Sequence, residues 1–327
     1  MPSRRVKFPG AALSSSAGAA LASSAGAALA SSAGAALASS AGVALASSAG
    51  VALASSAGVA LVSSAGVALA SSAGVALASV VEAMESELRV VVVPDYPGAL
   101  NGLQLASRSG RVTRVAVAVD ACEPVIREAV GAGVDLLLVH HGMFWSGLQR
   151  IEGALFRKLA LAMEAGLAIY SSHIPLDVHP VLGNNARLAA ALGLTKTEPF
   201  FPWKGIQLGL KASVDLDRAA LVENVRRAVG GSAVHLCAGG PSRVRHLGLI
   251  TGGAGAEIAA AAACGIDTFL TGEGPHWSYT LAEELGVNVI YAGHYATETF
   301  GVRALGEWLE REFQLPPAVF IDHPSGL

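Results

Sequence analysis

The stretch VDLLLVHH, residues 134–141, contains the feature that decides the fold class of this chain. Its apolar residues form a short continuous run, which is typical of a parallel-sheet strand that is buried on both faces. The run then ends in two adjacent histidines. In open α/β sheets, ligands collect at the carboxyl ends of the strands. The stretch therefore predicts an α/β fold with a binding site at the end of this strand.

The histidine pair His140 and His141 is a candidate metal ligand pair. Neutral imidazoles are good ligands for Zn, Fe, Ni or Mn. On an extended strand, neighbouring side chains point to opposite faces. Both rings can serve one site only if the chain turns at residues 141–142, which Gly142 would make easy. The alternative is a pair of histidines at a solvated strand end.

A second strand end repeats the pattern. Residues 167–170 form an apolar strand that leads through SSHIPL to Asp177. Pro175 stiffens this loop and would hold the carboxylate in place. Alternatively, Asp177 could cap a helix at residues 184–192, although its distance from that helix makes capping less attractive. We expect His173 and His179 in the same segment to be pocket-wall or surface residues.

A third candidate half-site follows the strand expected at residues 287–291. His294 and Glu298 are four residues apart, so on a helix they share one face. A histidine and a carboxylate at this spacing form a familiar metal half-site. Alternatively, Glu298 lies near the positive end of a helix dipole, which would leave His294 unexplained.

The remaining elements are read from periodicity and turn residues. Strands are expected at residues 114–120, 205–214, 234–237, 243–250 and 267–270, and helices at 80–88, 123–132, 156–165 and 278–285. Asp215 or Asp217 can cap a further helix that runs to Val229. The glycine turn at 252–255 lacks a GxGxxG pattern and a Walker lysine. Close packing of a strand and a helix is therefore favoured there over phosphate binding.

Residues 1–79 have a different composition from the rest of the chain. An eight-residue unit, ASSAG(A/V)AL, repeats with leucine at every eighth position from Leu13 to Leu77. Eight residues advance about 80° beyond two helical turns, so the leucines form no stable apolar stripe. We expect a disordered extension outside the fold, or a start codon placed too early. The Ser and Gly residues argue against a membrane span, and the length argues against an export signal.

Composition excludes several classes of protein. The net charge is -3, from 22 basic and 25 acidic residues, so no nucleic-acid partner is expected. The three cysteines form no CxxC pair, which argues against a disulfide framework or a thiolate zinc site. We expect a cytoplasmic protein with no membrane partner.

Five motifs in this order resemble the Nif-three-like dinuclear metal centre family, whose members are often called GTP cyclohydrolase type 2-like. The motifs are DYPGALNGLQ (95–104), DLLLVHHGMFW (135–145), YSSHIPLD (170–177), TGEGPHW (271–277) and GHYATE (293–298). They are spread over essentially the whole of residues 80–327, and the repeat has no counterpart in the family. The family commonly has Pro after the paired histidines, whereas this chain has Gly142, which puts the rigidity of that loop in doubt.

The resemblance implies a fold and a ligand set. It implies two interlinked α/β lobes with mixed sheets in residues 80–327, the second at roughly 205–285, and a metal site in the cleft between them. It also implies two divalent ions per protomer and a ring-shaped homohexamer. The implied metal ligands are His140, His141, Asp177, His294 and Glu298. His/carboxylate ligation without Cys suits Zn, Fe, Mn, Ni or Co.

Three functions are compatible with these ligands. The first is a metal-dependent hydrolase that acts on a small or nucleotide-like substrate, with His173, Glu273 and His276 as candidates for proton transfer or for orienting the ligands. The second is a non-enzymatic protein for metal storage, delivery or regulation. The third is an adaptor whose ring presents surfaces to partners, with structural metals.

Overall fold

The computed structural model describes residues 74–326, so most of the predicted repeat segment lies outside the described residues. The first described helix, α4 (Leu77–Glu87), begins three residues before the expected start at residue 80. Leu77 is buried in the same core cluster as Met84, which extends the helix into the last repeat unit. The short strand β1 (Val75–Ala76) precedes it and pairs antiparallel with β3 (Arg111–Val112).

One five-stranded sheet contains the paired histidines. Its strand order is β13-β4-β5-β6-β2, with bounds Val319–Phe320, Val115–Asp120, Leu136–His141, Ala168–Ser171 and Gly102–Leu105. Strands β13, β4, β5 and β6 are parallel, whereas β2 runs antiparallel to β6. The carboxyl ends of β5 and β6 therefore lie side by side at one edge of the sheet.

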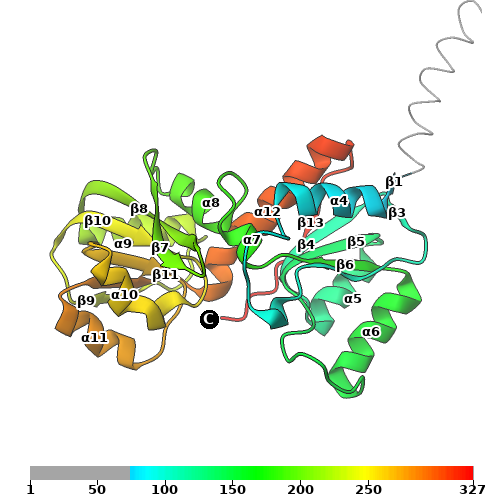
Figure 1. Cartoon of the computed structure of the whole chain (residues 1–327), viewed down its shortest axis with the longest axis horizontal. Helices are drawn as coiled ribbons and strands as arrows, with labels where there is room; N and C mark the ends of the chain where they lie inside the picture. Colours follow the sequence, from blue (N-terminus) through cyan, green and yellow to red (C-terminus); the bar gives the residue numbers. More distant parts are fainter. Residues whose placement is uncertain (1–73, 327) are drawn as a thin grey trace, which may run out of the picture. The chain divides into compact units, whose positions relative to one another are not determined.

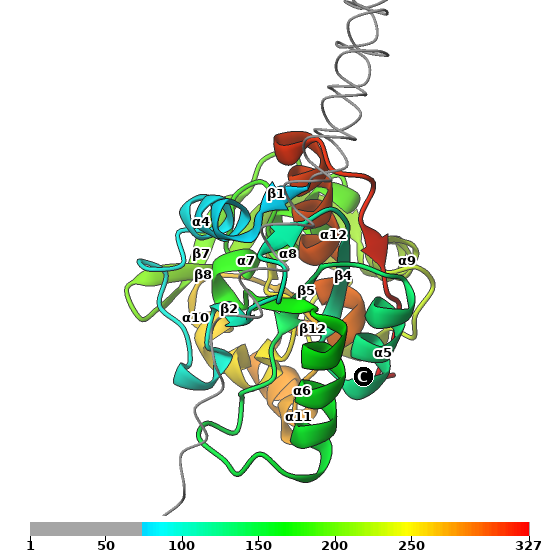
Figure 2. The ribbon, with the colours of Figure 1, turned by 90° about the vertical axis from the view of Figure 1, so that its right-hand side faces the viewer.

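Helices cover both faces of this sheet, which explains the continuous apolar run (Figures 1 and 2). Leu136 and Leu138 pack with α4 and with α12 (His294–Phe313). Leu137 and Val139 point the other way, toward α5 (Glu123–Gly131) and α6 (Gly153–Ala165). Full burial of a Leu side chain stabilises a fold by about 1.5–3 kcal/mol. This strand is therefore anchored through every apolar residue up to the histidines.

A second, six-stranded sheet forms the other lobe. Its strand order is β7-β8-β10-β11-β12-β9, with bounds Glu198–Trp203, Ile206–Asp217, Arg243–Leu249, Thr268–Thr271, Asn288–Tyr291 and His235–Ala238. Strands β10, β11 and β12 are parallel, and their neighbours pair antiparallel with them. This lobe is therefore mixed, as expected, but it begins at β7, before the expected residue 205.

The second sheet is also covered on both faces. Its helices are α9 (Arg218–Ala228), α10 (Ile258–Ala263) and α11 (Trp277–Leu285), and a 3-10 turn, η5, spans Ala254–Glu257. Phe269 and Val289 pack with α10 and α11, whereas Leu270 and Ile290 pack with α9. The N-cap of α9 is Asp217, whose side chain accepts hydrogen bonds from Ala219 N and Ala220 N. Of the two predicted N-caps, Asp215 and Asp217, it is therefore Asp217 that caps the helix.

Helix α12 links the two lobes (Figure 1). It follows β12 of the second sheet and packs against β4 and β5 of the first. Two further helices, α7 (Ile174–Asp177) and α8 (Asn184–Ala191), lie in the segment between the lobes, and α8 also contacts α12. A 3-10 turn, η4 (Pro97–Ala99), precedes β2. The predicted architecture of two interlinked α/β lobes with mixed sheets is confirmed.

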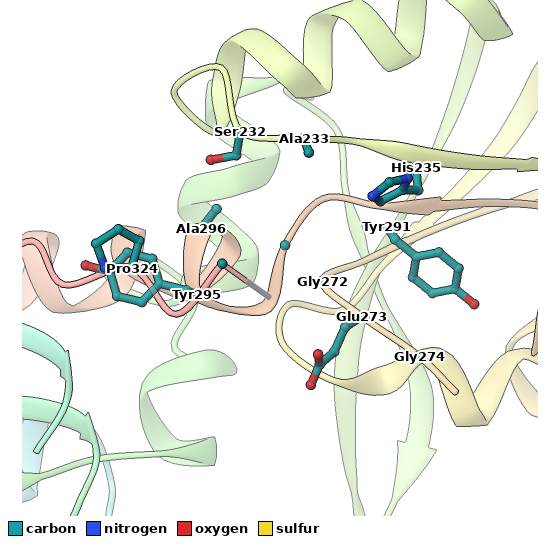
Figure 3. A pocket seen from close by; sticks show the side chains of 12 residues that line it. Ser232, Ala233, His235, Gly272, Glu273, Gly274, Tyr291, Tyr295, Ala296 and Pro324 are labelled. Carbon is teal, nitrogen blue, oxygen red and sulfur yellow. The ribbon is translucent and has the colours of Figure 1, made fainter. Parts of the chain in front are cut away.

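A cavity of about 540 Å³ lies beside the carboxyl ends of β11 and β12 (Figure 3). Its lining includes Glu273, Tyr291, Tyr295 and, from the C-terminal segment, Pro324. Tyr295 Oη donates a hydrogen bond to Asp322 Oδ1 at 2.8 Å, which ties that segment to α12. No helix in residues 74–326 is long and apolar enough to span a bilayer.

Candidate metal centre

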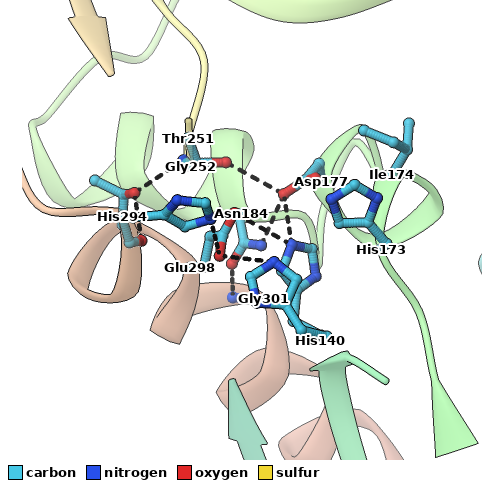
Figure 4. A network of polar contacts seen from close by, with 12 residues as sticks. His140, His173, Ile174, Asp177, Asn184, Thr251, Gly252, His294, Glu298 and Gly301 are labelled. Carbon is cyan, nitrogen blue, oxygen red and sulfur yellow. Dashed lines mark hydrogen bonds and ion pairs between the residues drawn. The ribbon is translucent and has the colours of Figure 1, made fainter. Parts of the chain in front are cut away.

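The five predicted ligands converge from three chain segments that follow strands (Figure 4). His140 and His141 end β5, and Asp177 ends the short helix α7, which follows β6. His294 and Glu298 lie in the first turns of α12, which follows β12. The carboxyl ends of strands from both lobes therefore contribute to one cluster.

The first donor group consists of His140, Asp177 and Glu298, all of which are buried. His140 Nε2 lies 3.5 Å from Asp177 Oδ1 and 3.4 Å from Glu298 Oε1. His140 Nδ1 is 2.9 Å from the carbonyl oxygen of Ser172, to which it donates. This hydrogen bond places a proton on Nδ1 and directs Nε2 at the carboxylates.

The second donor group consists of His141, His294 and the same Glu298. Glu298 Oε2 lies 3.3 Å from His141 Nε2 and 3.1 Å from His294 Nε2. Each ring is oriented by a carboxylate on its other nitrogen: His141 Nδ1 is 2.9 Å from Asp120 Oδ1, and His294 Nδ1 is 2.8 Å from Glu273 Oε1. Glu298 thus offers one oxygen to each group.

The expected turn at residues 141–142 is not what brings the two histidines together. β5 includes both residues, and His141 is still paired in register with Asp120 of β4. Both rings contact the same carboxylate because α12 places Glu298 at the end of the strand, within reach of His140 and His141. Gly142 instead leaves space for the Gln104 side chain, since a Cβ there would lie 2.1 Å from Gln104 Nε2.

Neighbouring polar groups hold Asp177 in place. Its Oδ1 accepts hydrogen bonds from Asn184 Nδ2 at 2.8 Å and from Thr251 Oγ1 at 3.2 Å (Figure 4). Asn184 Oδ1 in turn accepts from Gly301 N of α12 at 2.6 Å. The N-cap of α8 is Gly183, so Asp177 does not cap that helix. Both lobes and α12 therefore contribute to the position of this carboxylate.

The glycine turn at 252–255 forms a wall of the cluster. Gly252 has a φ of +73°, and a Cβ there would lie 2.2 Å from Glu298 Oε1. Its backbone N donates to Thr297 Oγ1 of α12 at 3.0 Å. The turn therefore lets the strand end approach α12 closely, whereas the sequence indicates close packing of the strand with the helix that directly follows the turn.

The charges of the cluster suit a cation. Burial alone would lower the pKa of His140, but Asp177 and Glu298 outweigh burial and raise it to about 10. Burial also opposes the charge on His294, yet Glu298 and Glu273 raise its pKa to about 9. Burial would raise the pKa of Glu298, but His140 and His141 hold it well below its usual range. In the described chain, the raised pKa values of His140 and His294 favour protonated rings that balance buried carboxylates.

Unpartnered buried atoms show that the residues fit a metal ion. Within residues 74–326, His140 Nε2 and Glu298 Oε2 are buried and make no hydrogen bond, only the ion-pair contacts given above. A buried polar atom without a partner costs about 1–3 kcal/mol. Both atoms belong to the donor set, and imidazole with carboxylate is a usual ligand combination for divalent transition metals.

The three candidate catalytic residues have different surroundings. The ligand atom of His173 lies within 4.8 Å of those of His140 and His141. Glu273 contacts the cluster through His294, in the predicted orienting position. His276 is exposed immediately before α11 and lies outside the cavity that borders the cluster. The structure therefore brings His173 and Glu273 to the site but not His276.

Two neighbours of the cluster were not predicted. Asp120 was recognised only as the acidic end of a strand, and its contact with His141 depends on the β4–β5 register. Asp95 accepts from His173 Nδ1 at 2.8 Å and from Ile174 N at 2.9 Å. The motif at 95–104 contains Asp95, but nothing in its spacing indicates a partner 78 residues away.

A family model described as Duf34/NIF3 (NGG1p interacting factor 3) matches residues 75–324, which is most of the chain. The chain belongs to this family. A Deinococcus radiodurans relative named GTP cyclohydrolase 1 type 2 homolog is 41% identical over 243 residues, covering 73% of this chain and 90% of the relative. A Halobacterium salinarum relative with the same name is 40% identical over 240 residues, covering 72% and 94%.

Solved structures of family relatives have the same fold. A Thermus thermophilus protein is 36% identical with a TM-score of 0.68, covering 76% of this chain and 98% of that one. Reduced HcgD from Methanocaldococcus jannaschii is 25% identical with the same TM-score and the same coverage. The resemblance found in the sequence motifs is therefore confirmed at the level of the family.

Glu273→Gln is expected to weaken metal binding at the second donor group. The carboxylate accepts from His294 Nδ1, which fixes the tautomer and raises the basicity of Nε2. Loss of such a partner typically lowers metal affinity by about 10–100-fold. Competition with a fluorescent zinc chelator would measure the change. Glu283→Gln, an exposed carboxylate on α11, is the control, and equal affinities in the two variants would contradict the prediction.

Metal binding is expected to release about two protons at pH 7, since His140 and His294 titrate near 10 and 9. Both pKa values are raised above the ordinary 6.5, so the stability that the charged rings give the metal-free chain is complete below pH 6.5. It is lost as the pH rises through 9 and 10. Calorimetry in buffers of different ionisation enthalpy counts the protons. If the Tm of the metal-free chain rose between about pH 7 and 10, the raised pKa values of His140 and His294 would be contradicted.

Proposed function

We propose that this chain binds two divalent metal ions, one at each donor group, with Glu298 bridging them. One observation carries the proposal: the two oxygens of this buried carboxylate face different sets of imidazoles. A carboxylate that bridges two ions is a recurrent feature of dinuclear sites. Zn, Fe, Mn, Ni and Co all suit His and carboxylate donors.

We further propose that the centre is hydrolytic and acts on a small substrate. When bound, a pair of divalent ions would make a hydroxide available at neutral pH. His141 and His294 line a cavity of about 510 Å³, whereas His140 is fully buried behind them. A substrate in this cavity would therefore meet the imidazoles of the second donor group, whereas the first group contributes only its carboxylates, Asp177 and Glu298, to the lining.

His173 is the residue placed to move a proton in this cavity. Asp95 fixes its Nδ1, which leaves Nε2 as the atom that can accept a proton. The backbone N of His173 also donates to Asn101 Oδ1 at 2.8 Å, so the ring position is constrained from two sides. An Asp–His pair that borders a metal-lined cavity is a usual arrangement for general acid–base catalysis.

Metal content of the full-length chain tests the metal proposal. The wild type is expected to bind about two ions per chain, as in two-metal hydrolases. Asp177→Asn removes a charged donor from the first group only, so about one ion should remain, at the second group. Glu257→Gln alters an exposed carboxylate on the same cavity and should keep both. Absence of metal after reconstitution with Zn, Fe and Mn would refute the proposal.

Turnover separates the hydrolase from the non-enzymatic alternative. Because the relatives are named GTP cyclohydrolase 1 type 2 homolog, GTP is the first compound to test. The Glu298→Gln variant serves as the negative control. Two bound ions without turnover on GTP or on a broad panel of small esters, amides and cyclic amidines would favour metal storage, delivery or regulation. The ring-shaped homohexamer stays a prediction, which the mass of the particle in solution would test.

A further inference from the structure

The cavity in front of the second donor group has a strongly aromatic lining. Tyr96, Trp145, Phe201 and Trp203 contribute to it, together with the apolar side chains of Ile174 and Leu208. Trp145 and Tyr96 are 39% and 49% exposed, so parts of both side chains are accessible to a ligand in the cavity. The four rings come from both lobes, so the cavity is built where the lobes meet.

One aromatic side chain stands directly beside the donor groups. The Trp145 ring lies 4.8 Å from the His173 ring and 5.9 Å from the His141 ring, edge to face in both cases. Its backbone packs closely against η4, because a Cβ on Gly98 would lie 2.6 Å from the Trp145 carbonyl oxygen. A ring bound against Trp145 would therefore be next to His141.

A second aromatic unit comes from the turn between β7 and β8. Trp203 and Tyr96 lie with their ring centroids 5.3 Å apart. Lys204 Nζ lies 4.4 Å from the Trp203 centroid and 4.7 Å from that of Tyr96, and it donates to the carbonyl oxygen of Asp95 at 3.1 Å. Lys204 therefore holds the two rings together, and its charge is already engaged.

Apart from the histidines, the charged side chains that line the cavity are acidic. Asp120, Asp177, Glu257 and Glu298 contribute carboxylates, and no Lys or Arg belongs to the lining described for this cavity. Outside the donor groups, nothing in this lining would neutralise a chain of phosphates. Aromatic faces, in contrast, bind planar rings by stacking and do not require charge.

We propose that the cavity binds a planar aromatic heterocycle that is uncharged or cationic and carries no phosphate. The ring contacts Trp145 and Trp203, and its polar edge faces His141 and His294. This inference rests on the proposed function, because it assigns the substrate class of the same centre. The name GTP cyclohydrolase 1 type 2 homolog suggests a triphosphate substrate for the relatives. The ligand proposed for this chain differs because it carries no phosphate.

Binding to the metal-free, full-length chain tests this inference without interference from phosphate–metal contacts. The probes are guanosine, adenosine and pterin, each titrated by calorimetry, with GTP as the charged counterpart of guanosine. At least one uncharged ring is expected to bind, and guanosine is expected to bind at least tenfold more tightly than GTP. Failure of all three rings to bind, or tighter binding of GTP, would overturn the inference.

Two tryptophan variants locate the bound ring. Trp145→Ala and Trp203→Ala are each expected to weaken binding of the best probe by about tenfold or more, the usual effect of losing one stacking partner. Trp277→Ala removes a half-exposed tryptophan on α11, outside the cavity, and should leave binding unchanged. Equal affinities in all three variants would overturn the inference. Metal content of the wild type and the three variants, measured after reconstitution in separate samples, separates its failure from failure of the dinuclear proposal.

Discussion

Glu298→Gln is expected to abolish binding of both metal ions, with affinity reduced by more than about 100-fold at each donor group, beyond the usual effect of losing an outer partner. Glu298 Oε1 faces His140, and Oε2 faces His141 and His294. A glutamine amide has the same shape but no charge and only one acceptor oxygen. It therefore cannot bridge two cations, and any metal-dependent turnover should fall with the metal content.

The fold should survive this substitution, because the first turns of α12 keep their packing and their backbone hydrogen bonds. Glu310→Gln, elsewhere on α12, controls for a change of charge on this helix. Metal analysis and circular dichroism of the two variants give the comparison. If Glu298→Gln retained two ions with near wild-type affinity, the bridging role would be wrong, and the two donor groups could not form one dinuclear centre.

The strand-end residues of the site could be predicted from the sequence because local patterns determine them. Continuous apolar runs predict buried parallel strands, and polar residues that follow them collect at one sheet edge. This reasoning places His140 and His141 beside Asp177 at the ends of β5 and β6. It also explains why His294, which follows a strand of the other sheet, belongs to the same site only if the two lobes face each other.

Asp177 and Glu298 each have two oxygens, so the sequence makes both carboxylates candidates for bridging or chelating roles. Which of them is shared by the two donor groups depends on where α12 lies relative to β5. The i, i+4 spacing indicates that His294 and Glu298 share a helix face, but not which oxygen faces which ring. For the same reason the sequence suggested a turn at residues 141–142 that the structure does not need. The two histidines share one site because of where α12 packs, and the backbone at residues 141–142 does not have to turn.

Elements without a clear local signal were missed. Strand β7 contains Pro199 and Pro202, and proline within a run argues against a strand except at a sheet edge, which is where β7 lies. The two-residue strand β13 is too short to show a period. For α12 the sequence indicated only the helix start. The helix continues through Gly301 and Gly306, where a Cβ would lie 2.7 Å from Asn184 Oδ1 and 3.0 Å from Val117 Cγ1.

The aromatic cavity illustrates the same limit for binding residues. Trp145 lies in a motif that the sequence singled out, but Trp203 and Lys204 lie in a β7–β8 turn that carries no recognisable pattern. They come together with Tyr96 only after the two lobes fold and pack. Residues that supply chemistry at strand ends were therefore predictable, whereas residues that would select a substrate were not.

Gly252→Ala is expected to disrupt the centre nearly as strongly as loss of a ligand. A Cβ at this position would lie 2.2 Å from Glu298 Oε1 and 3.4 Å from His294 Nε2. The φ of +73° is also unfavourable for alanine, at a cost of about 1–3 kcal/mol. The carboxylate must move or the turn must open, and either change separates the donor atoms. Metal content should fall to one ion or fewer, with a lower Tm of the metal-free chain.

Gly253→Ala is the matched control, since the neighbouring residue has a φ of -95° and its Cβ would lie 3.5 Å from the His294 ring, an ordinary contact. This variant should keep both ions and the wild-type Tm. Metal analysis and thermal unfolding of the two variants therefore compare one added methyl group at adjacent positions. If Gly252→Ala bound metal like Gly253→Ala, close approach of the turn to Glu298 would not be required, and the glycine would have only a backbone role.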